Sequence, residues 1–422
     1  MFRRVLRAPY SFPRLSRQTR WTILILSLAA FVEVYIHTRN YAVRQPHDHD
    51  LDTPFYTSCQ EPKINAPREK AALVMLARNK ELDKALKTVN SIERHFNQYF
   101  HYPIIFINDQ PWSEEFIRVM NATVSGEARF EVLEKEEWTF PEWMDEKAAK
   151  ESIAAQGRAG IIYAGLETYH HMCRFYSGKF YTLKALKDYK WYWRIEPDVD
   201  FYCTISYDPF VEMAKHDKVY GFTIGLPEES RTCPTLFREM SDWKEKHGIR
   251  TTELWKAMVE PSWAPWPFRS MMSWFSHRDA HGDAWSLCHY WSNFEIANLD
   301  FFRNRAYQDM FEYLDRTGKF YTERVSSLLS QTSSLLTLHS GATPPSTLSP
   351  LPCSLTRTRY TTLRILATAT TGISNALPTH QAASYRSPRS FGTASPTLSD
   401  LGVSAVAVSA TDLGRATTER TA

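Results

Sequence analysis

The sequence of 422 residues lacks a strong excess of either charge. Its 50 Lys and Arg against 47 Asp and Glu leave a net charge of +3, and the two signs are interspersed through the middle of the chain. Because nucleic-acid-binding proteins gather positive charge on one face, this balance argues against a nucleic-acid partner. The 43% hydrophobic and 14% aromatic content excludes a chain that is disordered as a whole and allows a substantial core.

Cysteine is also scarce, and its spacing excludes the common structural zinc sites, because no C-x-x-C pair occurs. In an oxidising compartment some of the first five cysteines could form disulfides, and buried thiols are an equally good interpretation of each. The six positions are Cys59, Cys173, Cys203, Cys233, Cys288 and Cys353.

The N-terminal region lacks an uninterrupted apolar run of the roughly 20 residues that span a bilayer comfortably. Residues 1–20 contain six arginines and no acid, an apolar run follows from Trp21 to Val32, and Glu33 interrupts it. The positive-inside rule predicts a cytoplasmic tail at 1–20, a type II signal-anchor at 21–37 and a polar lumenal stem at 38–66. A cleaved signal peptide is the alternative, but no small-x-small cleavage site follows.

The C-terminal segment 325–422 contains no Trp and no Lys, although the chain has thirteen Trp upstream, and it is rich in Ser, Thr, Ala, Leu and Pro. Such a composition predicts a disordered tail or a segment read from a shifted frame or an unspliced intron. The folded domain is therefore expected to occupy residues 67–324.

Within that domain the pattern alternates between strand and helix. Apolar residues 72–77 read as a strand, residues 81–96 have helical spacing, and residues 103–109 read as a second buried strand, which together predict the first β-α-β unit of an α/β sheet. The two strands end near Arg78 and Asp109, where ligands of open α/β sheets gather. Arg78 would suit a diphosphate or the edge of a base.

Further helices are expected at 114–120, 145–156 and 301–316, the last stopped by Gly318. Asn121 begins the only N-x-S/T sequon of the chain and is a candidate glycosylation site in a lumenal protein.

The most informative stretch is the Glu196-Pro197-Asp198 segment at the end of a predicted strand. Alternation with period two places Arg194, Glu196 and Asp198 on one side of that strand. A Glu-x-Asp pair suits Mg²⁺ or Mn²⁺, whose remaining ligands are water and substrate phosphates. The alternative is a solvated strand end in which Glu196 pairs with Arg194 or Lys190.

Residues 230–285 are rich in Trp and Pro. Such aromatic density predicts either an acceptor-sugar platform, because rings stack on pyranose faces, or ordinary core packing. The tryptophans are Trp243, Trp255, Trp263, Trp266, Trp274 and Trp285.

Four segments, taken together and in order, resemble the fungal α-1,2-mannosyltransferases of the Kre2/Mnt1 type, glycosyltransferase family 15. The resemblance runs from about Ala71 to Arg324. It implies a GT-A type fold with a mixed central sheet flanked by helices, a GDP-mannose donor, a mannose-terminated glycan acceptor, Mn²⁺, transfer with retention, and a Golgi membrane protein with a lumenal catalytic domain. The segments are residues 169–175 (YHHMCRF), 192–199 (YWRIEPDV), 220–224 (YGFTI) and 291–296 (WSNFEI).

The resemblance also implies roles for individual residues. Glu295 becomes the proposed nucleophile, and Glu196 with Asp198 becomes the proposed metal site. The donor-binding residues are then Tyr169, Arg194, Arg78 and Asp109, and the substrate-binding residues are Asn293 and Arg174.

After Arg324 the family continues with a Trp-Gly-Asp-Ala-Pro-Val-His-Ser-like segment, where this chain has Val325-Ser326-Ser327-Leu328. An aspartate and a metal-binding histidine of the family thus have no counterpart. This departure keeps open a noncatalytic glycan- or nucleotide-binding relative. A glycoside hydrolase that uses Glu196 and Glu295 is a weaker alternative.

Overall fold

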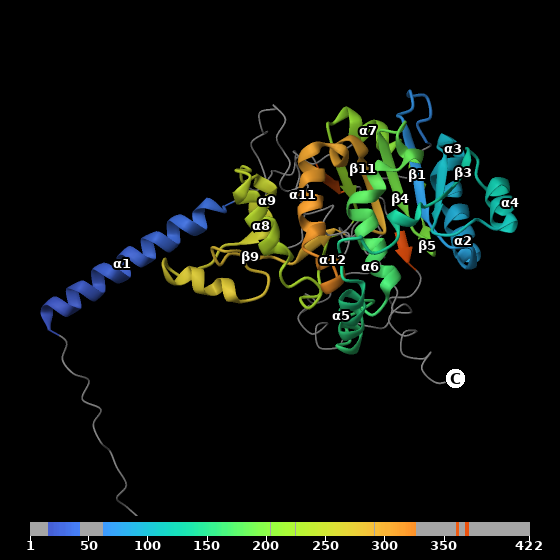
Figure 1. Cartoon of the computed structure of the whole chain (residues 1–422). Coiled ribbons are helices and arrows are strands. Elements are labelled where there is room, and N and C mark those ends of the chain that lie inside the picture. The colour runs from blue at the N-terminus through green and yellow to red at the C-terminus, as the bar shows by residue number, and fades with distance from the viewer. Residues whose placement is uncertain are drawn as a thin grey trace, which may run out of the picture.

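The computed structural model describes residues 16–42, 62–202, 204–223, 225–290, 292–325, 360–362 and 368–370. Its centre is a mixed sheet of seven strands (Figure 1). In spatial order these are β12 (Tyr360–Thr362), β6 (Tyr220–Phe222), β11 (Phe294–Asn298), β4 (Trp191–Ile195), β1 (Ala71–Leu76), β2 (Ile104–Asn108) and β3 (Ala128–Val132).

The strand directions determine which strand ends lie at the same edge of the sheet. β4, β1, β2 and β3 run parallel, whereas β11 is antiparallel to both β4 and β6. The central parallel strands are apolar over nearly their whole length because helices cover both of their faces. This confirms the predicted α/β class and the mixed sheet.

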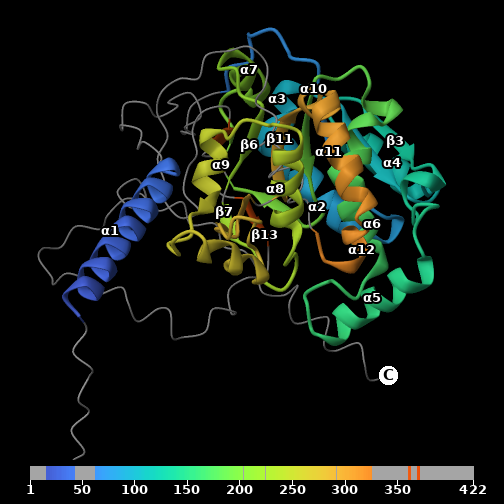
Figure 2. The same ribbon diagram turned by 60° about the vertical axis from the view of Figure 1, so that its left-hand side comes forward.

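One face of the sheet, which carries Val74 and Tyr192, packs against the larger group of helices. Figures 1 and 2 show α6, α11 and α12 together on this side of the strands. The helices are α5 (Glu146–Arg158), α6 (Glu167–Arg174), α8 (Leu236–Lys246), α9 (Glu253–Met258), α10 (Leu299–Arg303), α11 (Arg305–Arg316) and α12 (Lys319–Thr322).

The opposite face, which carries Leu73 and Trp193, packs against a second group of helices. The predicted helix at 81–96 is found here as α2 followed by a π-helical turn. The elements of this face are α2 (Leu82–Ile92), η4 (Glu93–Asn97), α3 (Gln98–Phe100), α4 (Glu114–Thr123) and α7 (Pro209–Lys215).

Short elements complete the described fold. Three two-stranded sheets pair β10 with β7, β13 with β5, and β8 with β9. Their strands are β10 (Cys288–Tyr290), β7 (Gly225–Pro227), β13 (Thr368–Thr370), β5 (Val199–Phe201), β8 (Val259–Glu260) and β9 (Ala284–Trp285). The remaining helical turns are η3 (Asn79–Glu81), η5 (Lys135–Glu137), η6 (Phe175–Lys179), η7 (Phe180–Thr182), η8 (Lys184–Leu186) and η9 (Phe268–Trp274).

The predicted stop at Gly318 is confirmed, because this glycine has φ +72° directly after α11, a conformation that favours glycine. The predicted helix at 301–316 is divided, since Asn304 is extended between α10 and α11 and its side chain caps α11 at the Tyr307 amide.

Helix α1 (Arg17–Asn40) projects away from the rest of the molecule (Figure 2). It is the one helix among the described residues that is long and apolar enough to cross a membrane, and none of its residues is buried. The helix is longer than the predicted anchor at 21–37. Most of the predicted stem at 38–66 and of the tail at 325–422 lies outside the described residues.

Candidate active site

The site forms where several strands end at one edge of the sheet. Arg78 follows β1, Asp109 follows β2 and Glu196 follows β4, and these three strands are parallel. Because β11 runs in the opposite direction, its beginning lies at the same edge, with Phe294 opposite Ile195. The next residues outward are Glu196 on one strand and Asn293 on the other.

Glu295 lies one residue further into the sheet, opposite Arg194 of β4 and Phe222 of β6. It is 1% exposed. The Tyr192 hydroxyl donates to its Oε1 at 2.8 Å and the Tyr220 hydroxyl donates to its Oε2 at 2.7 Å. Burial raises the pKa of Glu295, while the Arg194 charge and the two tyrosine hydrogen bonds oppose that rise.

Arg194 connects this buried carboxylate to the strand end. Its Nε donates to Glu196 Oε1 at 2.5 Å, and its guanidinium lies 3.5 Å from the ring centroid of Tyr176. Arg194 is 3% exposed, and its Nη1 has no hydrogen-bond partner among the described residues. A buried guanidinium nitrogen without a partner is suited to accept an anion.

The two carboxylates of the Glu-Pro-Asp segment have separate partners. Glu196 pairs with Arg194, as the alternative interpretation expected, whereas Asp198 forms ion pairs with Lys84 at 3.9 Å and Lys87 at 2.9 Å. Both lysines belong to α2, on the face opposite Glu295.

The prediction that alternation keeps Asp198 on the side of Arg194 is therefore wrong. The strand ends at Ile195, Pro197 interrupts the ladder, and Asp198 has φ +67°, so the chain turns before β5 begins. No group of three or more His, Cys, Asp or Glu side chains that could hold a metal is formed by the described residues.

Polar residues line the ends of β1 and β2. Arg78 is exposed and Asp109 is half-buried. Asn108 is more deeply buried than either, at 2% exposed, and its side-chain nitrogen and oxygen have no hydrogen-bond partner among the described residues. A buried amide of this kind can recognise the edge of a base. The sequence analysis included this residue in the second predicted strand, at 103–109, but gave it no role.

Tyr169 is half-buried on α6, and its hydroxyl accepts a hydrogen bond from Arg324 Nη1 at 2.9 Å. The same guanidinium donates through Nη2 to Glu228 Oε1 at 2.9 Å. Burial raises the pKa of Tyr169, so the phenol stays protonated. Tyr163 stacks on its ring.

Arg174 is committed to a buried, bidentate ion pair with Asp315 of α11, at 2.7 and 2.8 Å. A role in substrate binding would require this pair to open. The adjacent histidines are also internal: His170 bonds to the Phe320 and Ala164 carbonyls, and His171 bonds to the Tyr321 hydroxyl.

Other residues singled out in the sequence lie outside this edge of the sheet. Asn121 is exposed on α4. Cys173 and Cys233 are buried free thiols. Cys288 is also buried, and the other cysteines lie outside the described residues. The tryptophans of residues 230–285 divide into two sets. Trp243, Trp255 and Trp285 are buried, whereas Trp263, Trp266 and Trp274 are exposed.

Two features were missed from the sequence. Tyr192 and Tyr220 were part of the quoted motifs, but their convergence on Glu295 depends on the order β6-β11-β4, which no local pattern reveals. The Arg324 contact with Tyr169 joins residues far apart in the chain for the same reason.

Comparison with known proteins gives consistent results. The model of a family described as glycolipid 2-alpha-mannosyltransferase matches residues 32–340, beyond both ends of the resemblance noted in the sequence. The O-glycoside alpha-1,2-mannosyltransferase homolog 4 of Schizosaccharomyces pombe is 39% identical over 324 residues, which cover 72% of this chain and 73% of the relative. Alpha-1,2 mannosyltransferase KTR1 of Saccharomyces cerevisiae is 38% identical over 318 residues, which cover 73% of this chain and 77% of the relative.

Two solved structures are similar in sequence and fold. Core-mannan synthase A (CmsA/Ktr4) from Aspergillus fumigatus, in its Mn/GDP form, has 34% identity and a TM-score of 0.57, over 70% of this chain and 80% of that one. The mannosyltransferase Ktr4p from S. cerevisiae, in complex with GDP, has 27% identity and a TM-score of 0.58, over 73% of this chain and 81% of that one.

Proposed function

Because this chain belongs to the glycolipid 2-α-mannosyltransferase family, we propose that it transfers mannose from GDP-mannose to a mannose hydroxyl of a protein-linked glycan, forming an α-1,2 linkage with retention. The observation that carries this proposal is Glu295. It is a buried carboxylate, held by two tyrosine hydroxyls, one residue inside an edge where three parallel strands end. N-linked and O-linked glycans are chemically equivalent acceptors at this site, because each presents a mannose hydroxyl.

The donor is proposed to lie across the strand ends. Arg194 offers a buried nitrogen to an anion, Arg78 offers an exposed guanidinium, and Asp109 stands beside the buried amide of Asn108. Cationic groups therefore face the diphosphate, while amide and carboxylate groups face the nucleoside. Tyr169, with a protonated phenol, supplies a further donor to the phosphate or sugar.

Glu196, which lies at this edge, is the proposed protein ligand of Mn²⁺, and Asp198, which pairs with lysines on the opposite face of the sheet, would have to turn toward the edge to become the second. A hard cation takes few protein carboxylates and completes its coordination with water and substrate phosphates, so a cluster of three side chains is not required. Asp198 would exchange Lys84 and Lys87 for the cation. When bound, the metal stabilises negative charge on the departing diphosphate.

Retention is compatible with two routes at Glu295. In the first, its carboxylate bonds to the anomeric carbon as the bond to the diphosphate oxygen breaks, and the acceptor hydroxyl then displaces Glu295 and gives its proton to the released GDP. In the second, the acceptor oxygen attacks from the side of the leaving diphosphate, which takes the proton. Glu295 then stabilises the positive charge at the anomeric carbon.

Asn293, the residue that precedes β11, is proposed to bind an acceptor hydroxyl. We also propose that α1 anchors the protein in the Golgi membrane as a single-pass type II protein, with the catalytic domain in the lumen. Asn121, exposed on α4, would then be available for glycosylation.

A noncatalytic nucleotide-binding relative is the second candidate. It is favoured by one observation, namely that Glu295 has both oxygens occupied and is shielded from solvent. Measuring mannose transfer distinguishes the two candidates, because only the transferase forms a disaccharide.

The test is incubation of the full chain in detergent with GDP-mannose, Mn²⁺ and α-methylmannoside. We expect a disaccharide from the wild type, and from Glu295→Gln a loss of at least a thousandfold in kcat with GDP binding preserved. Glu93→Gln, which alters another buried glutamate that accepts from Asn97, is the matched control and should retain full activity. GDP-mannose binding without any disaccharide would refute the transferase in favour of the noncatalytic relative.

A further inference from the structure

An uncharged aromatic surface lies beside the end of α1. Residues 263–275 contain Arg269 as their only charged residue. The segment includes η9, and six of its large apolar side chains stand in solvent. Their exposures are Trp263 80%, Trp266 75%, Phe268 62%, Met271 53%, Trp274 84% and Phe275 63%. Soluble surfaces rarely gather so many exposed rings without a partner.

This aromatic segment is tied to α1 by its one charged residue. Arg269 Nη2 donates to both oxygens of Glu33 at 2.7 and 2.9 Å, and the Trp266 amide donates to Glu33 Oε2 at 3.2 Å. Arg269 is 9% exposed, so its charge does not reach the aromatic surface.

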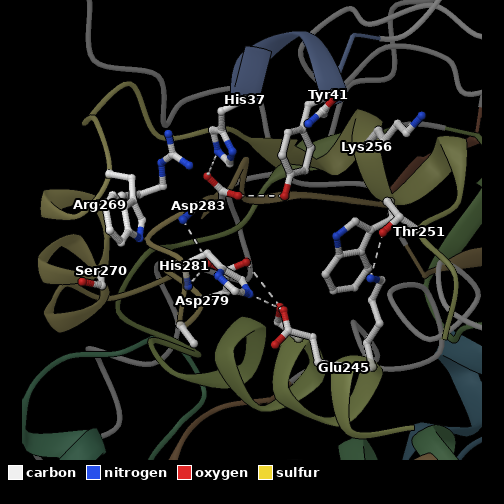
Figure 3. A pocket seen from close by; sticks show the side chains of 16 residues that line it. His37, Tyr41, Glu245, Thr251, Lys256, Arg269, Ser270, Asp279, His281 and Asp283 are labelled. Atoms are coloured by element: carbon white, nitrogen blue, oxygen red, sulfur yellow. Dashed lines mark hydrogen bonds and ion pairs between the residues drawn. The ribbon is translucent and has the colours of Figure 1, made fainter. Parts of the chain in front are cut away.

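A second contact fixes the same end of α1. His37 Nε2 lies 2.8 Å from Asp283 Oδ1, and the Tyr41 hydroxyl donates to Asp283 Oδ2 at 2.7 Å. Figure 3 shows His37 and Tyr41 pointing from α1 toward this buried carboxylate, with Arg269 nearby. The end of α1 is therefore joined to the domain by two polar contacts.

The position of Glu33 along α1 determines how deep in the bilayer the aromatic segment lies. The uninterrupted apolar run from Trp21 to Val32 is shorter than a bilayer core, so α1 spans the hydrocarbon only if Tyr35 and Ile36 are also near lipid. Glu33 then lies close to the lumenal boundary, where an unpaired charge is costly. Arg269 neutralises it, which requires the aromatic segment to lie at the same depth.

From this geometry we propose that residues 263–275 dock the catalytic domain onto the lumenal surface of the membrane that α1 crosses. The inference rests on the proposed anchor and goes beyond it. Trp and Phe side chains settle at the boundary between headgroups and acyl chains. The docked domain is held against the bilayer, so its acceptors must approach along the membrane surface.

The experiment uses the full chain reconstituted in phosphatidylcholine vesicles, with the photo-reactive p-benzoylphenylalanine at position 268 or 274 and radiolabelled lipid. We expect lipid adducts at least fivefold above those obtained with the same group at position 143. Trp143 is an exposed tryptophan outside this segment and serves as the matched control.

Two readouts keep the anchor and the docking surface distinguishable. Resistance to alkaline carbonate extraction reports on α1. A carbonate-resistant chain without excess lipid adducts at 268 and 274 would overturn the docking surface alone, whereas an extractable chain would overturn both proposals.

Other occupants of the surface give different results. A dominant chain-to-chain adduct would assign it to a second copy. A tenfold rise in the acceptor KM of the triple variant Trp263→Ser, Trp266→Ser, Trp274→Ser, measured in detergent, would assign it to the acceptor glycan. Either result would overturn membrane docking.

Discussion

Glu295 depends on two phenols that come from its two neighbouring strands. Because Tyr192 and Tyr220 donate to its oxygens, each stabilises the ionised form and keeps the pKa of Glu295 lower than burial alone would leave it. Transfer by either route needs the ionised carboxylate. Activity must therefore rise with pH as Glu295 loses its proton.

Removal of either phenol should move this rise to higher pH. For Tyr192→Phe and for Tyr220→Phe we expect the acidic limb of kcat/KM to shift up by about one pH unit, since a hydrogen bond to a charged group contributes about 1.5–3 kcal/mol. The measurement is kcat/KM for α-methylmannoside from pH 4.5 to 8.

Tyr307→Phe is the control for this shift, because Tyr307 is a buried tyrosine whose hydroxyl donates to the Ser177 carbonyl. Its profile should match the wild type. If all three variants have the same acidic limb, the ionisation of Glu295 does not govern the rate.

Lys87 competes with a cation for Asp198. The metal proposal therefore predicts the direction as well as the size of each variant's change in Mn²⁺ dependence. Its ammonium lies 2.9 Å from Asp198 and 3.0 Å from Asp200. Glu196→Gln and Asp198→Asn should each raise the Mn²⁺ concentration for half-maximal activity by at least about tenfold, because each removes an anionic ligand. Lys87→Gln should lower it.

Asn is chosen at position 198 because it tolerates the positive φ of the turn. An unchanged Mn²⁺ dependence in Asp198→Asn, beside a strong change in Glu196→Gln, would leave Asp198 with a role in the turn only.

Among the elements, the segment from β4 to β5 shows which side-chain orientations the sequence can predict and which it cannot. Alternation correctly separates Tyr192 and Arg194 from Trp191 and Trp193, because strand geometry is local. It fails at Asp198, because the direction of the chain after Pro197 is decided by contacts with α2.

The strand ends that carry Arg78 and Asp109 were likewise predictable, since buried runs followed by polar residues mark the edge of a parallel sheet. The partners of Glu295 and Tyr169 were not. They come from distant strands and from Arg324, and only the order of the sheet brings them together.

The Arg174–Asp315 pair joins α6 to α11, and the turn η6 that follows α6 approaches α11 closely at Gly178. A Cβ at Gly178 would lie 2.3 Å from the Phe311 ring, so the two elements pack without room for a side chain there. Removing one partner of a buried ion pair leaves the other charge without compensation.

Asp315→Ala should therefore lower the free energy of unfolding by about 3–5 kcal/mol, measured by chemical denaturation. The double variant Arg174→Met, Asp315→Leu should recover most of this loss, since it buries no lone charge. If Arg174 also binds substrate, the folded double variant will show a raised KM; an unchanged KM limits Arg174 to joining the two helices.

At the scale of the whole molecule, the sequence predicts an N-terminal apolar helix followed by a polar stem, most of which lies outside the described residues. The structure joins the end of α1 to the domain through the Asp283 carboxylate, and the backbone amide of Asp283 donates to the Asp279 carboxylate at 2.9 Å. The connection was not visible in the sequence, because the partners are separated by more than two hundred residues.

Asp279 makes this connection sensitive to pH. Burial, followed by the nearby Asp283 charge, raises the pKa of Asp279 from 3.8 to about 6. The folded protein thus binds the proton more tightly than the unfolded chain. Stability falls as pH rises from about 4 to about 6 and stays lower above that window.

Asp279→Asn removes the ionisation while keeping an oxygen to accept from the His281 and Asp283 amides. Relative to the wild type, the variant should gain about 2–3 kcal/mol on going from pH 4 to pH 7, because one pKa unit corresponds to 1.36 kcal/mol. Melting temperatures of the full chain in detergent at the two pH values measure this gain. The exposed Asp188→Asn variant should follow the wild type at both. If Asp279→Asn also follows the wild type, Asp279 is not protonated preferentially in the fold, and the junction of α1 with the domain has no pH dependence from this residue.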